Sequence, residues 1–287
     1  MGNHTLPNPS AIWVIGCGKM GEAFLRGAHA YFSGMGREKD LLVIEPADVT
    51  RERIASLYDV STFSSVEKAI ENGLFPEIIF LAVKPDRFLP LAGELKRLSS
   101  PVLAISVMAG ITLELLERHA PDFRWVRTMS NLALTTGEGM TLIAPGSMTT
   151  SSDERLVMDL FSRMGKALIL EEKDFDIATA LAGSGPGLMA LVGDALVDAG
   201  VLFGLKRDTA SLLVAQMFLG TGTLLLSGCS PSELKGHVSS PGGTTIEGIA
   251  SLESRAVRGA FIESISATVK KSRQLSGDPS GTAGAKN

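Results

Sequence analysis

The sequence of this 287-residue chain predicts an α/β fold followed by an all-α region. Two observations carry the prediction. Between residue 11 and about residue 169, short apolar runs alternate with helical stretches, which is typical of a parallel sheet covered by helices on both faces. After Glu171 the strand signals stop, and long stretches of Ala, Gly, Leu and Val follow. We therefore expect domains at residues 1–170 and 171–275, and a disordered, Gly- and Ser-rich tail at residues 276–287.

The expected strands all lie in the first of these regions. They are Ile12–Ile15, Leu41–Ile44, Glu77–Val83, Val102–Ser106, Arg124–Arg127, Met140–Ala144 and Ala167–Leu170. Helices are expected between them, for example at Thr50–Leu57 and Thr112–Arg118. Ligands bind open α/β sheets at the carboxyl ends of the strands, so residues that follow a strand are the first candidates for a site.

The first strand runs into Gly16-Cys-Gly-Lys-Met-Gly21, which is a Gly-x-Gly-x-x-Gly motif. In such a motif Gly16 permits the tight turn, Gly18 lets the backbone approach a pyrophosphate, and Gly21 allows close helix–strand packing. With a β-rich strand before it and a second strand after it, the motif predicts an N-terminal Rossmann-like dinucleotide-binding domain.

Glu45, at the end of the second strand, bears on the choice of cofactor. Its carboxylate can accept hydrogen bonds from ribose hydroxyls and repels a 2′-phosphate, which favours NADH over NADPH. Arg51 or Arg53 could still reach a 2′-phosphate, so both cofactors stay open.

The second region contains two stretches that are apolar on every side, Asp176–Phe203 and Thr209–Leu226. Asp194, Asp198 and Pro186, with many glycines, argue against a membrane span. A helix that is apolar all round is buried on every side, and about 110 residues could hardly hide two such helices alone. We therefore expect an all-α C-terminal dimerisation domain and a homodimer, and leave a higher oligomer open.

A turn of small residues, Ser239-Ser-Pro-Gly-Gly-Thr-Thr245, precedes a helical pattern near the C-terminus. Val257, Phe261, Ile265 and Val269 recur on one face of that helix. The unpaired amides of such a turn, together with the helix dipole, can bind an anion, and a carboxylate would suit. An ordinary capped turn is the alternative.

Composition excludes several other classes. Apolar residues make up 45% of the chain, charged residues 20%, and the net charge is −4, which argues against a nucleic-acid partner. The N-terminus does not resemble a secretory signal, so a cytoplasmic location is expected. Cys17 and Cys229 make neither a disulfide framework nor a metal cluster, and no metal is expected.

Together the glycine motif and the C-terminal turn resemble the pyrroline-5-carboxylate reductase family, the enzymes of the last step of proline synthesis. Leu81-Ala-Val-Lys-Pro85 is similar to the family's Ala-Val-Lys-Pro motif, and Ala180-Leu-Ala-Gly-Ser-Gly-Pro186 to its Leu-Ser-Gly-Ser-Gly-Pro motif. Val238-Ser-Ser-Pro-Gly-Gly-Thr-Thr245 matches the family signature. The resemblance extends over residues 11 to 275.

The resemblance implies NAD(P)H-dependent reduction of 1-pyrroline-5-carboxylate, a small-molecule substrate, to L-proline. Because an iminium is already a good electrophile, positioning can supply most of the acceleration. The substrate carboxylate would be held by Ser240, Gly242, Gly243 and Thr244. Thr245 would bind the ring nitrogen as the catalytic residue, with a helix-capping role as the alternative.

The resemblance also implies a set of cofactor-binding residues. They are Gly16, Gly18, Lys19, Met20, Gly21, Glu45, Ala82, Lys84, Pro85, Met108, Ala109 and Asn131. Lys84 has a solvated strand-end lysine as its alternative. His237, just before the signature, is either a proton-handling residue or a histidine at a helix end.

Two segments depart from the family pattern. Met129-Ser-Asn-Leu-Ala-Leu-Thr135 lacks the prolines of Met-Pro-Asn-Thr-Pro-Ala, which removes rigidity, and Gly187-Leu-Met-Ala190 lacks an aromatic residue. These changes keep two alternatives open: a reductase of another cyclic imine carboxylate, and a nucleotide-binding regulatory protein without catalysis. A β-hydroxyacid dehydrogenase is disfavoured because Met189 occupies the position of its catalytic lysine.

Overall fold

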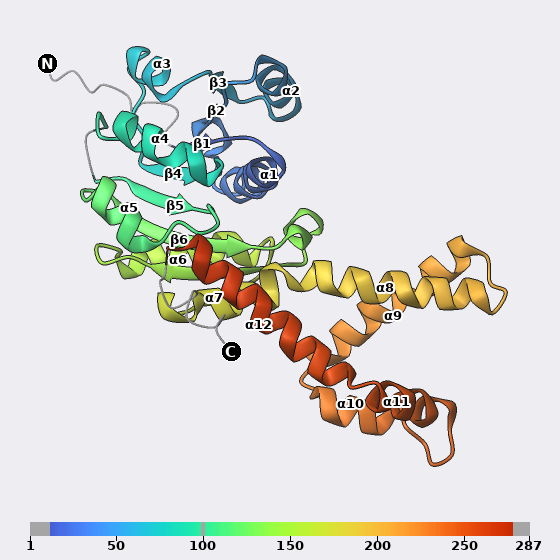
Figure 1. Cartoon of the computed structure of the whole chain (residues 1–287). Helices are drawn as coiled ribbons and strands as arrows, with labels where there is room; N and C mark the ends of the chain where they lie inside the picture. The colour runs from blue at the N-terminus through green and yellow to red at the C-terminus, as the bar shows by residue number, and fades with distance from the viewer. Residues whose placement is uncertain (1–11, 99–100, 278–287) are drawn as a thin grey trace, which may run out of the picture. The chain divides into compact units, whose positions relative to one another are not determined.

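The computed structural model describes residues 12–98 and 101–277 (Figure 1). The chain forms two compact units, residues 1–183 with 269–287 and residues 184–268. The predicted domain boundary at residue 170 falls inside the first unit. Of the expected tail, residues 278–287 lie outside the described residues, whereas the Ser276 hydroxyl donates a hydrogen bond to Asp176.

The first unit is built on an eight-stranded sheet with the strand order β3-β2-β1-β4-β5-β6-β7-β8. The strands are β1 (Ile12–Ile15), β2 (Leu41–Ile44), β3 (Ser61–Phe63), β4 (Ile78–Leu81), β5 (Leu103–Ser106), β6 (Arg124–Ser130), β7 (Gly139–Pro145) and β8 (Gly165–Ile169). The α/β fold class is confirmed. The order reverses direction between β1 and β4, which is where open α/β sheets bind ligands.

One prediction about this sheet was wrong. We expected parallel strands throughout, but β6 and β7 pair antiparallel, with Ser130 opposite Thr141. Only residues 131–138 connect these strands. A parallel crossover needs a dozen or more residues, so the short connection allows only the antiparallel arrangement.

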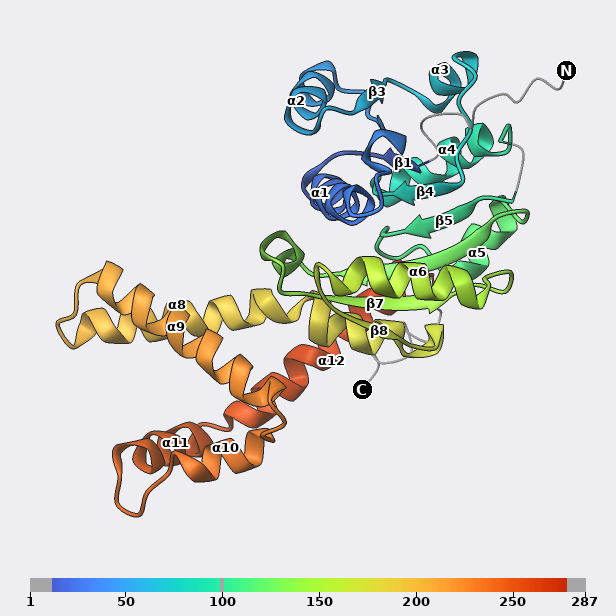
Figure 2. The same cartoon turned by 180° about the vertical axis from the view of Figure 1, so that it is seen from behind.

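Helices cover both faces of the sheet, because alternate strand residues point to opposite sides. Trp13 and Leu81 pack with α3 (Val66–Glu71), α4 (Phe88–Leu95), α5 (Leu113–His119) and α7 (Phe175–Ala178). Val14 and Phe80 pack with α1 (Lys19–Ser33), α2 (Asp48–Tyr58) and α6 (Ser151–Ser162). Figure 1 shows α4 and α5 in front of the sheet, and Figure 2 shows α1 and α6 on the other side.

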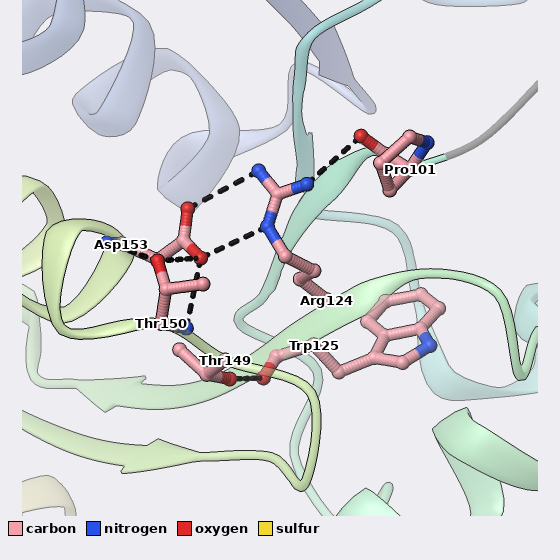
Figure 3. Close-up of polar contacts among 6 residues, drawn as sticks. All are labelled: Pro101, Arg124, Trp125, Thr149, Thr150 and Asp153. Atoms are coloured by element: carbon pink, nitrogen blue, oxygen red, sulfur yellow. Dashed lines mark hydrogen bonds and ion pairs between the residues drawn. The ribbon is translucent and has the colours of Figure 1, made fainter.

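The start of α6 is fixed by a partly buried network (Figure 3). Thr150 caps the helix and exchanges hydrogen bonds with Asp153 in a capping box. The Asp153 carboxylate also accepts from Nε (2.9 Å) and Nη2 (3.2 Å) of Arg124 on β6. A third Arg124 nitrogen donates to the Pro101 carbonyl at 2.9 Å.

The second unit is helical. It contains α8 (Gly185–Leu202), α9 (Arg207–Leu226), α10 (Pro231–His237), α11 (Thr244–Ser254) and the first part of α12 (Val257–Leu275). α8 and α9 pack against each other, yet large apolar side chains on both remain exposed, such as Leu191 (71%), Leu212 (70%) and Leu226 (72%). Residues 172–202 and 207–226 are long and apolar enough to cross a membrane, judged by length and composition alone.

The end of α12 belongs to the first unit, which comprises residues 269 onward. There the Asp176 carboxylate accepts hydrogen bonds from the hydroxyls of Ser272 and Ser276. Gly110 lies against Leu275, because a side chain at Gly110 would come within 3.0 Å of the Leu275 carbonyl oxygen. The first unit therefore combines residues that precede the second unit in the sequence with residues that follow it.

Candidate functional site

The glycine loop follows β1 and leads into α1. Gly16 has a left-handed backbone (φ +89°), and its N–H donates to the Ile44 carbonyl at 2.8 Å. A Cβ at Gly16 would lie 2.8 Å from the Ala82 carbonyl oxygen, and one at Gly21 would overlap the Gly16 carbonyl. Turn conformation and tight packing therefore explain these two glycines without any ligand.

Gly18 differs from both. It occupies the N-cap position of α1 and no described protein atom lies within 4 Å of where its Cβ would be. Nothing in the packing of the described chain requires glycine here. Lys19 is exposed and Met20 half-buried beside it. The first turn of α1 thus presents backbone amides that fit the close approach of a pyrophosphate.

Glu45 is fixed beside this loop. Its Oε2 accepts from the Cys17 N–H at 2.8 Å and its Oε1 from the Ala47 N–H at 3.1 Å. Burial, followed by the charges of Glu22 and Glu45, raises the pKa of the Cys17 thiol to about 12. Cys17 is therefore a small buried residue with a neutral thiol. The Glu45 side chain is held beside the loop by its two hydrogen bonds.

The two arginines that could reach a 2′-phosphate are both engaged elsewhere. Arg51 Nη1 donates to the carbonyls of Glu45 (2.9 Å) and Pro46 (2.8 Å), and Nη2 pairs with Asp48. Arg53 forms a two-pronged pair with Glu22 at 2.7 and 2.6 Å. Binding a phosphate through either guanidinium would require breaking these contacts.

The ends of β4 and β5 carry further candidates. The Ala82 N–H donates to the Ile15 carbonyl at 2.8 Å, which brings this segment next to the glycine loop. Lys84 and Pro85 are exposed at the start of a 3-10 turn, Pro85–Arg87. Met108 is buried, with 2% exposed, and Ala109 after it is exposed.

Asn131 follows β6 and is held by the protein itself. Its Nδ2 donates to the Ala182 carbonyl at 3.0 Å, and its Oδ1 accepts from the Met140 N–H at 3.3 Å. The next residues form a 3-10 helix, Leu132–Thr136, in which the Thr135 and Thr136 hydroxyls donate to backbone carbonyls at 2.8 Å. Side-chain hydrogen bonds thus hold this loop in the absence of prolines.

A buried ion pair near this loop was not predicted. Arg127, with 6% exposed, lies on β6, and its Nη1 donates to Glu172 Oε1 at 2.7 Å. Its guanidinium lies 4.6 Å from the centre of the Phe175 ring. The same Glu172 oxygen accepts from the Leu113 N–H at the start of α5. The only sequence signal was that Arg127 directly follows the apolar pair Trp125-Val126 in a predicted strand.

The predicted carboxylate site lies in the second unit. Gly242 adopts φ +67°, the Gly243 N–H donates to the Ser240 carbonyl at 3.0 Å, and Gly243 is the N-cap of α11 without a side-chain cap. Thr244 and Thr245 are the first two residues of α11, and both are exposed.

The capping alternative for Thr245 is therefore wrong. No described residue hydrogen-bonds its hydroxyl. His237 is the exposed last residue of α10.

The structure thus gathers the candidates into two groups. The predicted cofactor residues all belong to the first unit, and Ser240, Gly242, Gly243, Thr244 and Thr245 belong to the second. Among the described residues, no group of three or more His, Cys, Asp or Glu side chains is arranged to hold a metal ion.

Two family models match separate parts of the chain. Residues 172–275 match the family model for pyrroline-5-carboxylate reductase dimerisation, and residues 11–110 match that for NADP oxidoreductase, coenzyme F420-dependent. Pyrroline-5-carboxylate reductase of Arabidopsis thaliana is 35% identical, covering 94% of this chain and 98% of its own. That of Escherichia coli K12 is 34% identical, covering 92% and 98%.

Solved structures agree. A pyrroline-5-carboxylate reductase from Coxiella burnetii has a TM-score of 0.84 at 29% identity, covering 94% of this chain and 99% of that one. The Plasmodium falciparum pyrroline carboxylate reductase, a structure with NADP bound, has a TM-score of 0.78 at 29% identity, covering 92% and 97%. The glycine loop, the Gly-Gly-Thr-Thr turn and this near-complete coverage show that the chain belongs to the pyrroline-5-carboxylate reductase family.

Proposed function

We propose that this chain is an NAD(P)H-dependent reductase that converts 1-pyrroline-5-carboxylate to L-proline. The observation that carries the proposal is the start of α11. There the backbone amides of Thr244 and Thr245 have no side-chain cap, and the Thr245 hydroxyl has no partner among the described residues. This is a fitting site for a carboxylate with a polar ring atom close by.

Positioning dominates the proposed mechanism. The reduced nicotinamide, when bound, supplies the hydride that goes to the imine carbon. The first turn of α1 at Gly18 holds the pyrophosphate, and Glu45 accepts hydrogen bonds from the ribose. Gly242, Gly243 and Thr244, with Ser240, hold the carboxylate. Thr245 orients the ring nitrogen through its hydroxyl. That nitrogen is already protonated in the iminium form of the substrate, so addition of hydride to the carbon gives the amine directly.

NADH is the proposed cofactor. The carboxylate of Glu45, at the end of β2, would accept hydrogen bonds from the ribose hydroxyls and would repel a 2′-phosphate. Neither nearby arginine is available to offset that repulsion, since Arg51 binds its own loop and Arg53 binds Glu22. The ratio of kcat/KM for NADH and NADPH in the wild-type protein tests this choice, and a ratio below one would contradict it.

We also infer a cytoplasmic homodimer formed through the helical second unit, residues 184–268. The support is the match of residues 172–275 to a dimerisation family and the exposed apolar surface of α8 and α9. A second copy of this surface would remove it from water without a membrane. Nucleic-acid partners are not part of the proposal, since the net charge is −4.

Turnover assays test the reaction directly. Oxidation of NADH and NADPH is followed at about 340 nm, the absorbance band of the reduced nicotinamide, with pyrroline-5-carboxylate and wild-type, Thr245→Val and Thr245→Ser proteins. Thr245→Val keeps the side-chain shape but lacks the hydroxyl, so its kcat should fall about 100-fold while the KM for NADH stays constant. Thr245→Ser keeps the hydroxyl and should retain most activity.

Two results would change the assignment. Equal kcat in Thr245→Val and the wild type would remove the catalytic role of the hydroxyl. Wild-type protein that binds NADH but does not turn over pyrroline-5-carboxylate would contradict the proposed substrate. The assay would then move to larger cyclic imine carboxylates, because no described protein atom lies within 4 Å of a Cβ at Gly187, or to a regulatory role.

A further inference from the structure

Strand β6 holds the segment that leads out of the first unit, residues 172–183, which we call the connector. The contacts come from alternate positions, as expected for one face of a strand. Arg127 pairs with Glu172 at 2.7 Å and covers Phe175. Met129 lies against Gly183, where an added Cβ would be 3.2 Å from its Cε. Asn131 donates to the Ala182 carbonyl at 3.0 Å.

The end of the connector has an unusual conformation. Thr179–Gly183 form a π-helical turn, which is rare, less favourable than α-helix, and frequent at functional sites. Such a turn disturbs the regular ladder of backbone hydrogen bonds and leaves carbonyl groups that need other partners. The Asn131 carboxamide is the partner of Ala182.

The orientation of the Asn131 carboxamide is fixed at both ends. Its oxygen accepts from the Met140 N–H at 3.3 Å, so its nitrogen must face the connector. The Asn131 N–H also donates to the Met140 carbonyl at 3.3 Å. Every side-chain contact of Asn131 that the structure shows is therefore to the protein backbone, and a direct role at the nicotinamide would compete with these contacts.

Asn131 follows the carboxyl end of β6, at the edge of the sheet where ligands of open α/β folds bind. β6 lies parallel to β5, and their carboxyl ends are at the same edge of the sheet. Met108 and Ala109, which are among the expected cofactor-binding residues, follow β5 at that edge. Gly183, at the other end of the contact, belongs to the Gly-Ser-Gly-Pro segment that resembles a family motif.

We propose that Asn131 is a positioning residue, which acts through the Ala182 carbonyl to hold the π-turn and the backbone at Gly183 in the geometry that the reaction needs. This role replaces the cofactor contact expected from sequence. It rests on the proposed reductase function.

The test compares Asn131→Asp with the wild type and with Asn72→Asp. Asp at position 131 keeps an acceptor for the Met140 N–H but removes the donor to Ala182 and adds a negative charge beside that carbonyl. Asn72 is a matched control, because its Nδ2 donates to the Lys68 carbonyl at 2.8 Å in an exposed helix end. The measurements are kcat, the Kd of NADH from nicotinamide fluorescence, and backbone hydrogen exchange over residues 179–186 of the full chain.

For Asn131→Asp we expect faster exchange over residues 179–186 and a kcat lower by about 10- to 100-fold, because small misplacements in an active site have effects of this size. The Kd of NADH should change by less than about twofold, since no ground-state contact with the cofactor is lost. Asn72→Asp should match the wild type in all three measurements. Asn131→Ser, which adds no charge, is the second variant should the aspartate prevent folding, and the same pattern is expected for it.

Three results would overturn the proposal. Unchanged exchange over residues 179–186 would show that Asn131 does not hold the turn. Faster exchange with unchanged kcat would show that the turn has no part in the reaction. A Kd of NADH that weakens in proportion to the loss of kcat would make Asn131 a cofactor ligand. Absence of wild-type turnover overturns the proposed function and this role with it, whereas ordinary wild-type turnover beside unaltered variants overturns only the role of Asn131.

Discussion

Gly16 and Gly18 stand two positions apart in one motif but are glycine for different physical reasons. Gly16 has a left-handed backbone and no room for a Cβ beside Ala82. Gly18 has an ordinary φ of −70° and free space around it. The fold requires the first, whereas the packing of the described residues does not require the second, where we propose that a pyrophosphate approaches.

Alanine substitutions should separate these two roles. Gly16→Ala should lower the free energy of unfolding by about 1–3 kcal/mol, because it places an L-residue in a left-handed conformation next to a carbonyl oxygen. Gly18→Ala should unfold at the wild-type temperature but raise the Kd of NADH at least about tenfold, equivalent to about 1.4 kcal/mol. Differential scanning calorimetry and fluorescence titration measure the two effects. Wild-type NADH affinity in Gly18→Ala would contradict the proposed pyrophosphate contact.

Local residue patterns predicted some parts of the candidate site and missed others. The glycine loop and the Gly-Gly-Thr-Thr turn could be predicted because their function depends on backbone shape, which local residue types set. The contacts Arg127–Glu172 and Asn131–Ala182 join residues 45 and 51 positions apart. No local pattern encodes such a pairing, so these residues could only be interpreted once the fold had brought them together.

Among the elements, α6 depends for its start on the ion pair between the buried Asp153 and the partly exposed Arg124 (Figure 3). Burial alone would raise the pKa of Asp153, but hydrogen bonds from Arg124 and Thr150 outweigh it, and the pKa is lowered. A lowered pKa means that protonation favours the unfolded chain. The stabilisation is therefore complete above the pKa of the unfolded carboxyl, about 3.9, and is lost as pH falls through the folded-state value.

Arg124→Met should destabilise the protein by about 3–5 kcal/mol at pH 7, because it leaves the Asp153 carboxylate buried without its partner. The difference from wild type should shrink as pH falls through the lowered folded-state pKa of Asp153, because protonation of the carboxylate removes the ion pair. Urea unfolding at several pH values measures both effects. The control is Arg118→Met, which breaks an exposed pair with Glu114 on α5 and should change little. A pH-independent difference for Arg124→Met would contradict this account.

Element prediction succeeded where burial was complete. β1 and β2 have the bounds read from sequence, because all four residues of each are apolar and buried. β3 was missed because Ser61-Thr62-Phe63 is short and only partly buried at the edge of the sheet. The antiparallel β6–β7 pair was missed because residue composition reports burial and not strand direction.

For the whole molecule, the most important feature is the exposed apolar surface of α8 and α9. These helices are apolar on most sides, so the sequence indicated that they must be covered, and the structure shows that a single chain leaves them exposed. The hydrophobic effect then favours a second copy strongly, at about 25 cal/mol per Å² of apolar surface removed from water.

A charged residue on this surface should therefore weaken the proposed dimer. Light scattering should show a wild-type dimer, and Leu212→Glu should shift the equilibrium toward monomer at low micromolar concentration, because burying an unpaired carboxylate is costly. Val49→Glu is the control, since Val49 is equally apolar and 81% exposed but lies on α2. A monomeric wild-type protein would contradict the proposed assembly.

The hydrogen bonds from Ser272 and Ser276 of the C-terminal segment to Asp176 affect the order in which the first unit folds during synthesis. During synthesis, the strands and their covering helices emerge first, but Ser272 and Ser276 arrive only after residues 184–268 have been made. The first unit therefore stays unfinished until Ser272 and Ser276 have been made. Residues 184–268 form a loop between the two parts of the first unit. The entropic cost of bringing the ends of such a loop together grows slowly, by about 0.6 kcal/mol for each doubling of loop length. A change in the length of the inserted residues 184–268 should therefore alter the stability of the first unit only slightly.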